Sequence, residues 1–121
     1  MKINNIELPD LDIFEADIAE KYETEIEKVK EGSKNFEGMK DSEVIRKSCN
    51  LVFDCFNNLF GLGTDKKIFG NKTNLLVCVN AFDQLVDNIN EQKKKADALA
   101  NRFNQKYQNR AQRRHNKKKR R

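Results

Sequence analysis

The stretch DSEVIRKSCNLVFDCFNNLF, residues 41–60, decides the fold of this chain. Its apolar residues recur every three or four positions, which predicts a helix with one buried face. That face consists of Ile45, Cys49, Val52, Phe53, Phe56 and Phe60. Each phenylalanine, once buried, stabilises the fold by about 1.5–3 kcal/mol. Gly61 follows directly, where a helix stop is expected, so residues 41–60 are predicted to be the central core helix.

Two further helices are predicted on either side of this core. Residues 11–31 carry a narrow apolar stripe on an otherwise charged rod, with Asp12 and Glu15 spaced as in a capping box. Residues 74–108 contain no proline or glycine. The apolar face predicted for their first half, which should pack on the core helix, is formed by Leu75, Val79, Phe82, Leu85, Val86 and Ile89. Beyond Glu91 the apolar pattern thins, so the far half of this helix is expected to extend past the core.

The connection between the second and third helices, GLGTDKKIFGNKT at residues 61–73, is rich in glycine. It predicts an ordered loop or a short hairpin, held to the core by Phe69. The fold class is therefore all-α: one helical domain over residues 1–108, with about three main helices, followed by a basic tail at residues 109–121.

Charge is strongly segregated along the chain. Residues 7–31 carry ten acids and three lysines, whereas residues 109–121 carry eight basic residues and no acid. The basic residues of the tail are Arg110, Arg113, Arg114, Lys117, Lys118, Lys119, Arg120 and Arg121. Such a tail can bind phosphate backbones, pair with an acidic protein surface, or serve only as a solvated terminus. The sequence leaves these three possibilities open.

Several function classes receive no support from the sequence. No run approaches the roughly 20 apolar residues of a membrane span, and no signal peptide is recognisable, so a cytosolic location is expected. The three cysteines, Cys49, Cys55 and Cys78, form no CxxC pair and are predicted to be buried core residues. The glycine-rich loop does not match a nucleotide-binding motif. The single histidine, His115, lies in the basic tail. We therefore expect no enzyme, no cofactor and no metal.

Residues 53–89, FDCFNNLFGLGTDKKIFGNKTNLLVCVNAFDQLVDNI, carry a family resemblance. The spacing of their phenylalanines and glycines resembles that of the small tail-assembly chaperones from long-tailed phages and prophages of Gram-positive bacteria. The ending Asn109-Arg110-Ala111-Gln112-Arg113-Arg114 is similar to the Arg-rich C-termini of such proteins. The resemblance rests on spacing and carries no catalytic signature.

This resemblance implies a non-catalytic protein of the host cytoplasm, absent from the mature virion. It implies that the protein binds apolar helical segments of the tape measure protein and helps to recruit tail tube subunits. Binding of this kind needs an apolar face that is exposed in the empty protein. The residues predicted to form it are Phe14, Ile18, Tyr22 and Ile26 of the first helix, with Leu99, Phe103 and Tyr107 of the third.

Surfaces of this kind commonly self-associate, so a homo-oligomer is expected. The alternative for both stripes is that they close on a single core. The alternative function is a small nucleic-acid-binding protein that uses the basic tail, and a third possibility is a structural component of the phage tail.

Overall fold

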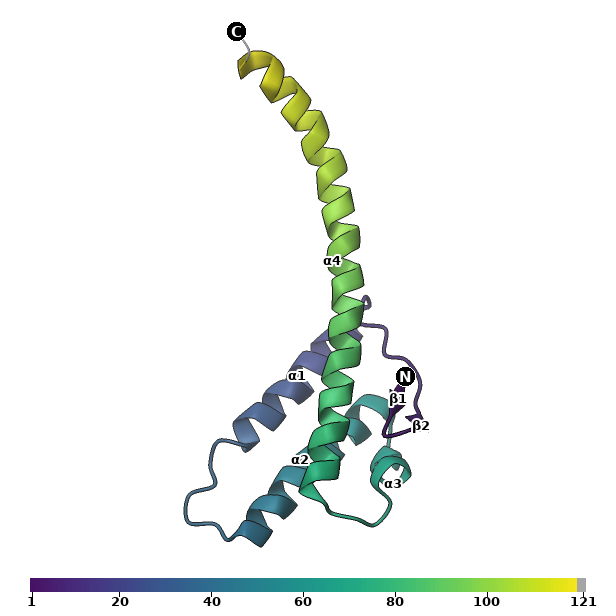
Figure 1. Cartoon of the computed structure of the whole chain (residues 1–121), viewed down its shortest axis with the longest axis vertical. Coiled ribbons are helices and arrows are strands. Elements are labelled where there is room, and N and C mark those ends of the chain that lie inside the picture. The colour runs from purple at the N-terminus through teal and green to yellow at the C-terminus, as the bar shows by residue number, and fades with distance from the viewer. Residues whose placement is uncertain (120–121) are drawn as a thin grey trace. The chain divides into compact units, whose positions relative to one another are not determined.

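The computed structural model describes the backbone of residues 1–119 and the side chains of residues 1–105. Within this part, the elements are strands β1 (Lys2–Ile3) and β2 (Ile6–Glu7) and helices α1 (Ala16–Gly32), α2 (Asp41–Phe60), α3 (Thr64–Phe69) and α4 (Leu75–Lys119) (Figure 1). The prediction of a mostly helical chain is confirmed. Two compact units divide the chain, Met1–Ile89 and a second unit that begins at Asn90. Each unit is described by itself.

The core of the first unit lies between its helices. In Figure 1, α1 and α2 lie side by side and run in opposite directions, joined by residues 33–40. The most deeply buried large side chains are Phe56, Ile3, Leu85, Ile89, Cys49, Cys55 and Cys78. They come from the N-terminal hairpin, from α2 and from the start of α4, so three separate parts of the sequence close on one another. The predicted bounds of the central helix, 41–60, are confirmed.

The buried face of α4 is confirmed in part, since Leu85 and Ile89 are buried and Leu75 and Phe82 pack against the core. Val79, expected inside, is 43% exposed, whereas Cys78 and Ala81 are fully buried together with Leu85 and Ile89. The 78-81-85-89 spacing follows the helical period as well as the predicted set does. Cys78 lies against α2, where it forms a hydrogen bond with Cys49.

The segment 61–73 contains a short helix where a loop or hairpin was expected. Asn57 Oδ1 accepts a hydrogen bond of 3.0 Å from the backbone N–H of Asp65, and Thr64 Oγ1 donates one of 2.7 Å to the carbonyl of Gly61. These bonds stabilise the first turn of α3. Phe69 is buried, as predicted, and its ring centroid lies 4.9 Å from that of Phe53 and 5.9 Å from that of Phe56.

Helix α1 begins at Ala16 rather than at residue 11. The side chain of Asp12 accepts a hydrogen bond of 3.1 Å from the backbone N–H of Phe14, and the carbonyl of Asp12 accepts one of 3.2 Å from Glu15. Asp12 thereby forms a turn of its own, as short acidic side chains often do, and no side-chain bond caps the helix at Glu15. The C-terminal end of α4 also differs from the prediction, since this helix continues to Lys119 rather than ending at residue 108.

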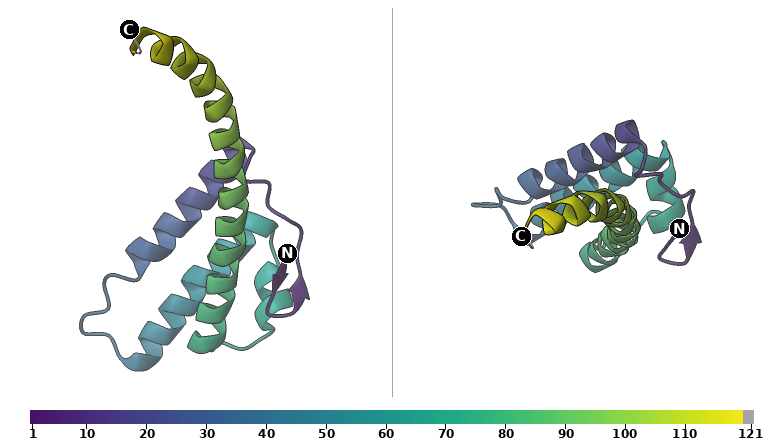
Figure 2. Two further views of the ribbon diagram at one scale, coloured as in Figure 1. Left: turned by 45° about the horizontal axis from the view of Figure 1, so that its top comes forward. Right: turned by 90° about the horizontal axis from the view of Figure 1, so that it is seen from above.

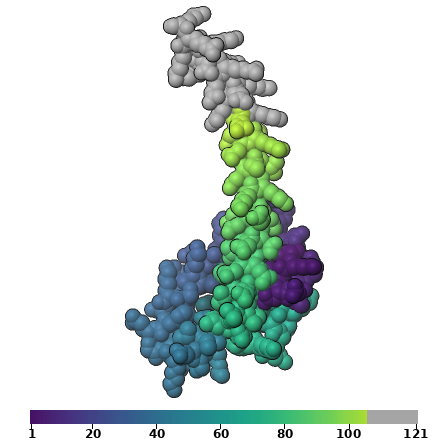
Figure 3. Space-filling model, in the orientation of Figure 1, coloured from purple at the N-terminus to yellow at the C-terminus, as the bar shows by residue number. Residues whose placement is uncertain are grey.

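A small N-terminal hairpin was not predicted. Asn4 and Asn5 have φ angles of 48° and 66°, the pair of positive values that a tight two-residue turn requires. Ile3 pairs with Ile6 across the turn, and its side chain is fully buried. Figures 2 and 3 show this segment against the α4 residues of the same unit.

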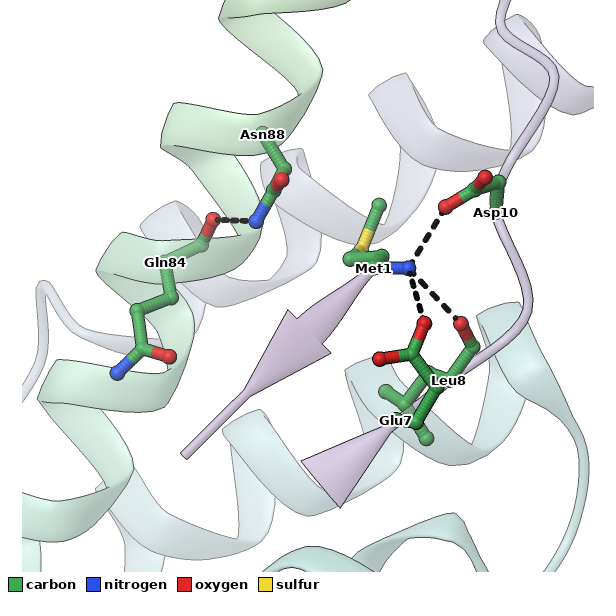
Figure 4. A network of polar contacts seen from close by, with 6 residues as sticks. All are labelled: Met1, Glu7, Leu8, Asp10, Gln84 and Asn88. Carbon is green, nitrogen blue, oxygen red and sulfur yellow. Dashed lines mark hydrogen bonds and ion pairs between the residues drawn. The ribbon is translucent and has the colours of Figure 1, made fainter. Parts of the chain in front are cut away.

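The chain start is held by three hydrogen bonds (Figure 4). The Met1 ammonium donates to Glu7 Oε1 at 3.1 Å, to the Leu8 carbonyl at 3.1 Å and to Asp10 Oδ1 at 2.7 Å. The bonds to Asp10 and Glu7 raise the pKa of this ammonium above 8.0. The hairpin is thus fixed at its open end as well as at its turn.

Candidate helix-binding surface

The apolar stripe of α1 is largely part of the core. Tyr22 is 5% exposed, and Ile18 and Ile26 are half-buried and pack against the core cluster. Phe14 is 56% exposed but precedes the helix. The α1 stripe therefore closes on the core, which is the alternative arrangement named for it above. Ile18, Tyr22 and Ile26 do not form an open surface here.

A buried carboxylate lies on the same inner side of α1. Glu25 is 4% exposed; its Oε1 accepts a hydrogen bond of 2.6 Å from Asn58 Nδ2, and its Oε2 accepts one of 3.0 Å from Lys28 Nζ. Asn58 belongs to α2, so this carboxylate ties the two helices together. Its bonds satisfy the charge that burial would otherwise penalise, and we assign it a structural role.

The three cysteines are free and buried, as predicted. Burial raises the pKa of the Cys55 thiol to about 12, and the nearby Glu25 charge adds to the rise. Burial, together with a hydrogen bond to Cys49, likewise raises the pKa of Cys78 to about 12. A nucleophilic or metal-binding cysteine needs a lowered thiol pKa, so the environment of these two thiols favours inert core packing.

The described part of the chain contains neither a metal-binding cluster nor a membrane-spanning helix. Among those residues, no group of three or more His, Cys, Asp or Glu side chains is arranged to hold a metal ion. In the same part of the chain, no helix is both long and apolar enough to cross a bilayer.

Exposed large apolar side chains occur in both units. The first unit exposes Leu62, Leu76 and Val79 in addition to Phe14. In the second unit, Leu99 is 58% exposed and Phe103 is 66% exposed, on a stretch of α4 whose residues 97–105 are all exposed. These two residues were predicted from the sequence to bind a partner, and the structure places both at the surface. The side chain of Tyr107, the third predicted residue of this helix, lies outside the described residues.

The second unit carries apolar residues in a coiled-coil register. In α4, residues spaced alternately by three and four positions run from the first unit into the second. They are Cys78, Phe82, Leu85 and Ile89, followed by Gln92, Ala96, Leu99 and Phe103. Spacing of this kind marks the a and d positions of a heptad, the positions that face a partner helix. In the second unit we call Gln92, Ala96, Leu99 and Phe103 the distal seam. It is the candidate binding surface.

The charged residues that flank the distal seam all have the same sign, and the remaining flanking position is Ala100. In this register, Lys93 takes an e position, and Lys95 and Arg102 take g positions. The two acids of the segment, Glu91 and Asp97, fall at the outer c and b positions, and Glu91 forms an ion pair of 3.2 Å with Lys94, which is also outside the seam. The borders of the seam are therefore cationic. These flanking residues were not predicted, because no heptad register had been assigned to this part of the sequence.

The division of charge follows the division into units. Residues 1–89 contain 11 basic and 17 acidic residues, a net charge of −6, and residues 90–121 contain 13 basic and 2 acidic residues, a net charge of +11. Part of the +11 net charge of residues 90–121 comes from the basic tail. Outside the described residues lie Arg120 and Arg121 altogether, and the side chains of Arg110, Arg113, Arg114, Lys117, Lys118 and Lys119.

The described part of the chain is mostly helical and exposes Leu99 and Phe103 on α4. The chain belongs to DUF6673, a family of unknown function, whose model matches residues 4–117. The match covers both units, including the distal seam. Comparison with curated proteins finds no match, and neither does comparison with solved structures.

Proposed function

We propose that this chain is a non-catalytic protein that binds an apolar helical segment of another protein along the distal seam. The observation that carries the proposal is the exposure of Leu99 and Phe103, at 58% and 66%, in heptad register on α4. Paired a and d side chains bury apolar area when a second helix adds to the first. Fully burying one such side chain stabilises a complex by about 1.5–3 kcal/mol.

The resemblance to tail-assembly chaperones suggests the client. Tape measure proteins are long and helical, and a chaperone of this class keeps their apolar segments soluble until tail tube subunits assemble around them. The first unit would then act as a folded base, because its own apolar faces close on one core. Assembly of several copies, a location in the host cytoplasm and absence from the virion belong to the same proposal.

Co-expression tests this proposal. The chain is produced together with a tape measure protein of a long-tailed phage, and the soluble fraction of that protein is measured after nuclease treatment. Wild-type chain should raise the soluble fraction, and Leu99→Ser with Phe103→Ser should abolish the gain. A matched control is Leu62→Ser, which alters a 97% exposed leucine of the first unit. The proposal fails if the seam variant performs as well as wild type.

Nucleic-acid binding is the second candidate, favoured by the +11 charge of residues 90–121. A protein that neutralises several phosphates loses affinity steeply as salt rises. Under this alternative, replacing the eight basic residues of the basic tail with glutamine abolishes binding to duplex DNA or RNA, and the seam substitutions have no effect. Under the helix-binding proposal, the glutamine variant still solubilises the client.

A further inference from the structure

We infer that the helix bound by the distal seam carries acidic residues along both borders of its apolar face, and that it comes from a different protein rather than from the distal seam of a second copy of this chain. The inference rests on the proposed function and specifies the chemistry of the partner.

Charge at the borders of the seam is the first step. Residues at e and g positions lie beside the partner helix and set which partners pair. Here the charged flanking residues, Lys93, Lys95 and Arg102, are all cations, and the nearest acids, Glu91 and Asp97, occupy outer positions. Glu91 is already paired with Lys94 at 3.2 Å. A partner with Glu or Asp at its own e and g positions would place opposite charges along both borders.

Charge disfavours the pairing of this surface with the same surface of a second copy. Two distal seams placed together would bring cations to their shared borders with no acid facing them. In an antiparallel pair, g positions face g positions, so Lys95 and Arg102 would meet their own counterparts. Like-charge juxtaposition of this kind selects against a partner. A homo-oligomer of this chain would therefore use another surface.

The third step concerns the weak apolar content of the seam. Gln92 and Ala96 occupy two of its four a and d positions, and only Leu99 and Phe103 are large. Such a short seam buries little area, so charge at its borders contributes a larger share of the discrimination between partners. Exposed ion pairs are each worth about 0.2–1 kcal/mol, which for three pairs amounts to a selectivity of about tenfold.

Two designed peptides test the inference on the full-length chain. Both are helices of about four heptads with the same apolar a and d residues; one has Glu at every e and g position, and the other has Lys. Like charges keep each peptide from pairing with itself. Dissociation constants are measured by fluorescence anisotropy at low and at moderate salt. We expect the Glu peptide to bind about tenfold more tightly at low salt, with a smaller difference once salt screens the borders.

Matched charge reversals locate the effect. Lys95→Glu, at the border of the seam, should reduce the preference for the Glu peptide about two- to fivefold. Lys94→Glu makes the same change of charge one residue away, on the outer side, and should leave the preference unchanged. Phe103→Ser should weaken both peptides.

The other outcomes are equally definite. If the two peptides bind equally and Phe103→Ser weakens both, the inference is overturned and the proposed function stands. If neither peptide binds, both fail. If the Glu peptide binds Phe103→Ser as tightly as it binds wild type, the basic tail attracts it without the seam, and the inference is overturned. The inference would also be overturned if the chain self-associates and Phe103→Ser abolishes this self-association.

Discussion

Asn4 and Gln84 exchange two hydrogen bonds between the N-terminal turn and α4. The backbone N–H of Asn4 donates to Gln84 Oε1 at 2.7 Å, and Gln84 Nε2 donates to Asn4 Oδ1 at 2.8 Å. The two residues are eighty positions apart, so this pair holds the hairpin on the helix that also carries the distal seam, together with a bond of 3.4 Å from Asn4 Nδ2 to the Val77 carbonyl. The carbonyl of Gln84 accepts a further bond of 2.8 Å from Asn88 (Figure 4).

Gln84→Ala should therefore lower the free energy of unfolding of the first unit by about 1–3 kcal/mol, because a partly buried amide N–H and a side-chain carbonyl lose their partners. Urea denaturation followed by circular dichroism measures the change. Asn80→Ala, an exposed position on the same helix, serves as the control and should shift stability by less than about 0.5 kcal/mol. Equal stabilities for the two variants would show that the hairpin does not depend on Gln84.

The contact between Glu25 and Asn58 makes a second prediction. Asn58→Ala leaves the buried Glu25 carboxylate without its 2.6 Å donor from α2, and should cost about 1.5–3 kcal/mol of unfolding free energy. In Glu25→Leu/Asn58→Ala the charge is gone, and much of that loss should be recovered. A double-mutant cycle, with each single variant measured by urea denaturation, gives the coupling energy. A coupling near zero would contradict the role assigned to this pair.

Stability should fall in alkaline solution because of the buried thiols. In the folded state the pKa of Cys55 and of Cys78 is raised from 9.0 to about 12. Below pH 9 both states are protonated and the stabilisation is fully present. Above pH 9 the unfolded thiols ionise while the folded ones do not, so stability is lost progressively up to about pH 12. Between pH 9 and 10 each thiol should account for about 1 kcal/mol of the loss.

Comparison of wild type with Cys55→Ala isolates one thiol in this titration. The variant is less stable at every pH, because a buried side chain is shortened, but its unfolding free energy should fall less steeply between pH 9 and 10. Identical slopes would show that Cys55 is not protonated in the folded state as described. Lysine ionisation is common to both proteins and cancels in the difference. Burial and the nearby Cys55 raise the pKa of Tyr22 from 10.0 to about 12, so this tyrosine contributes mainly above pH 10.

The distal seam should be dispensable for folding. Leu99→Ser and Phe103→Ser alter exposed side chains outside the first unit, so the unfolding free energy of that unit should change by less than about 0.5 kcal/mol. Leu85→Ala, in the core, should cost about 2–5 kcal/mol. Thermal denaturation of the three variants is the measurement. A loss for Phe103→Ser as large as for Leu85→Ala would mean that Phe103 belongs to the core.

The sequence predicts the central helix well because its phenylalanine spacing admits one buried face. Prediction from the sequence fails where two sets of residues fit the helical period equally well. On α4, positions 78 and 81 fit the helical period as well as Val79 does, so the spacing alone does not decide which of them is buried. The hairpin depends on two asparagines in the left-handed region, a weaker signal than Asn-Gly. Burial of the α1 stripe depends on tertiary packing that a narrow amphipathic pattern does not specify.

For the candidate surface, Leu99 and Phe103 follow from the sequence, because a helix without breakers continues past its core. The cationic borders are equally visible in the sequence once a heptad register is assigned, and the burial of Cys78, Leu85 and Ile89 fixes that register. Tyr22 was assigned to the binding surface because its side chain completes an apolar stripe. Its burial against the core takes it out of that surface.

Site-specific photo-crosslinking tests the central claim most directly. A photoreactive amino acid is placed at position 99 of the distal seam or at position 94 on the outer side of the same helix, and crosslinked proteins from phage-producing cells are identified by mass spectrometry. The account predicts that position 99 crosslinks a long helical protein, with acidic residues bordering the crosslinked segment, and that position 94 does not. Equal crosslinking from both positions, or crosslinks at position 99 to this chain alone, would contradict it.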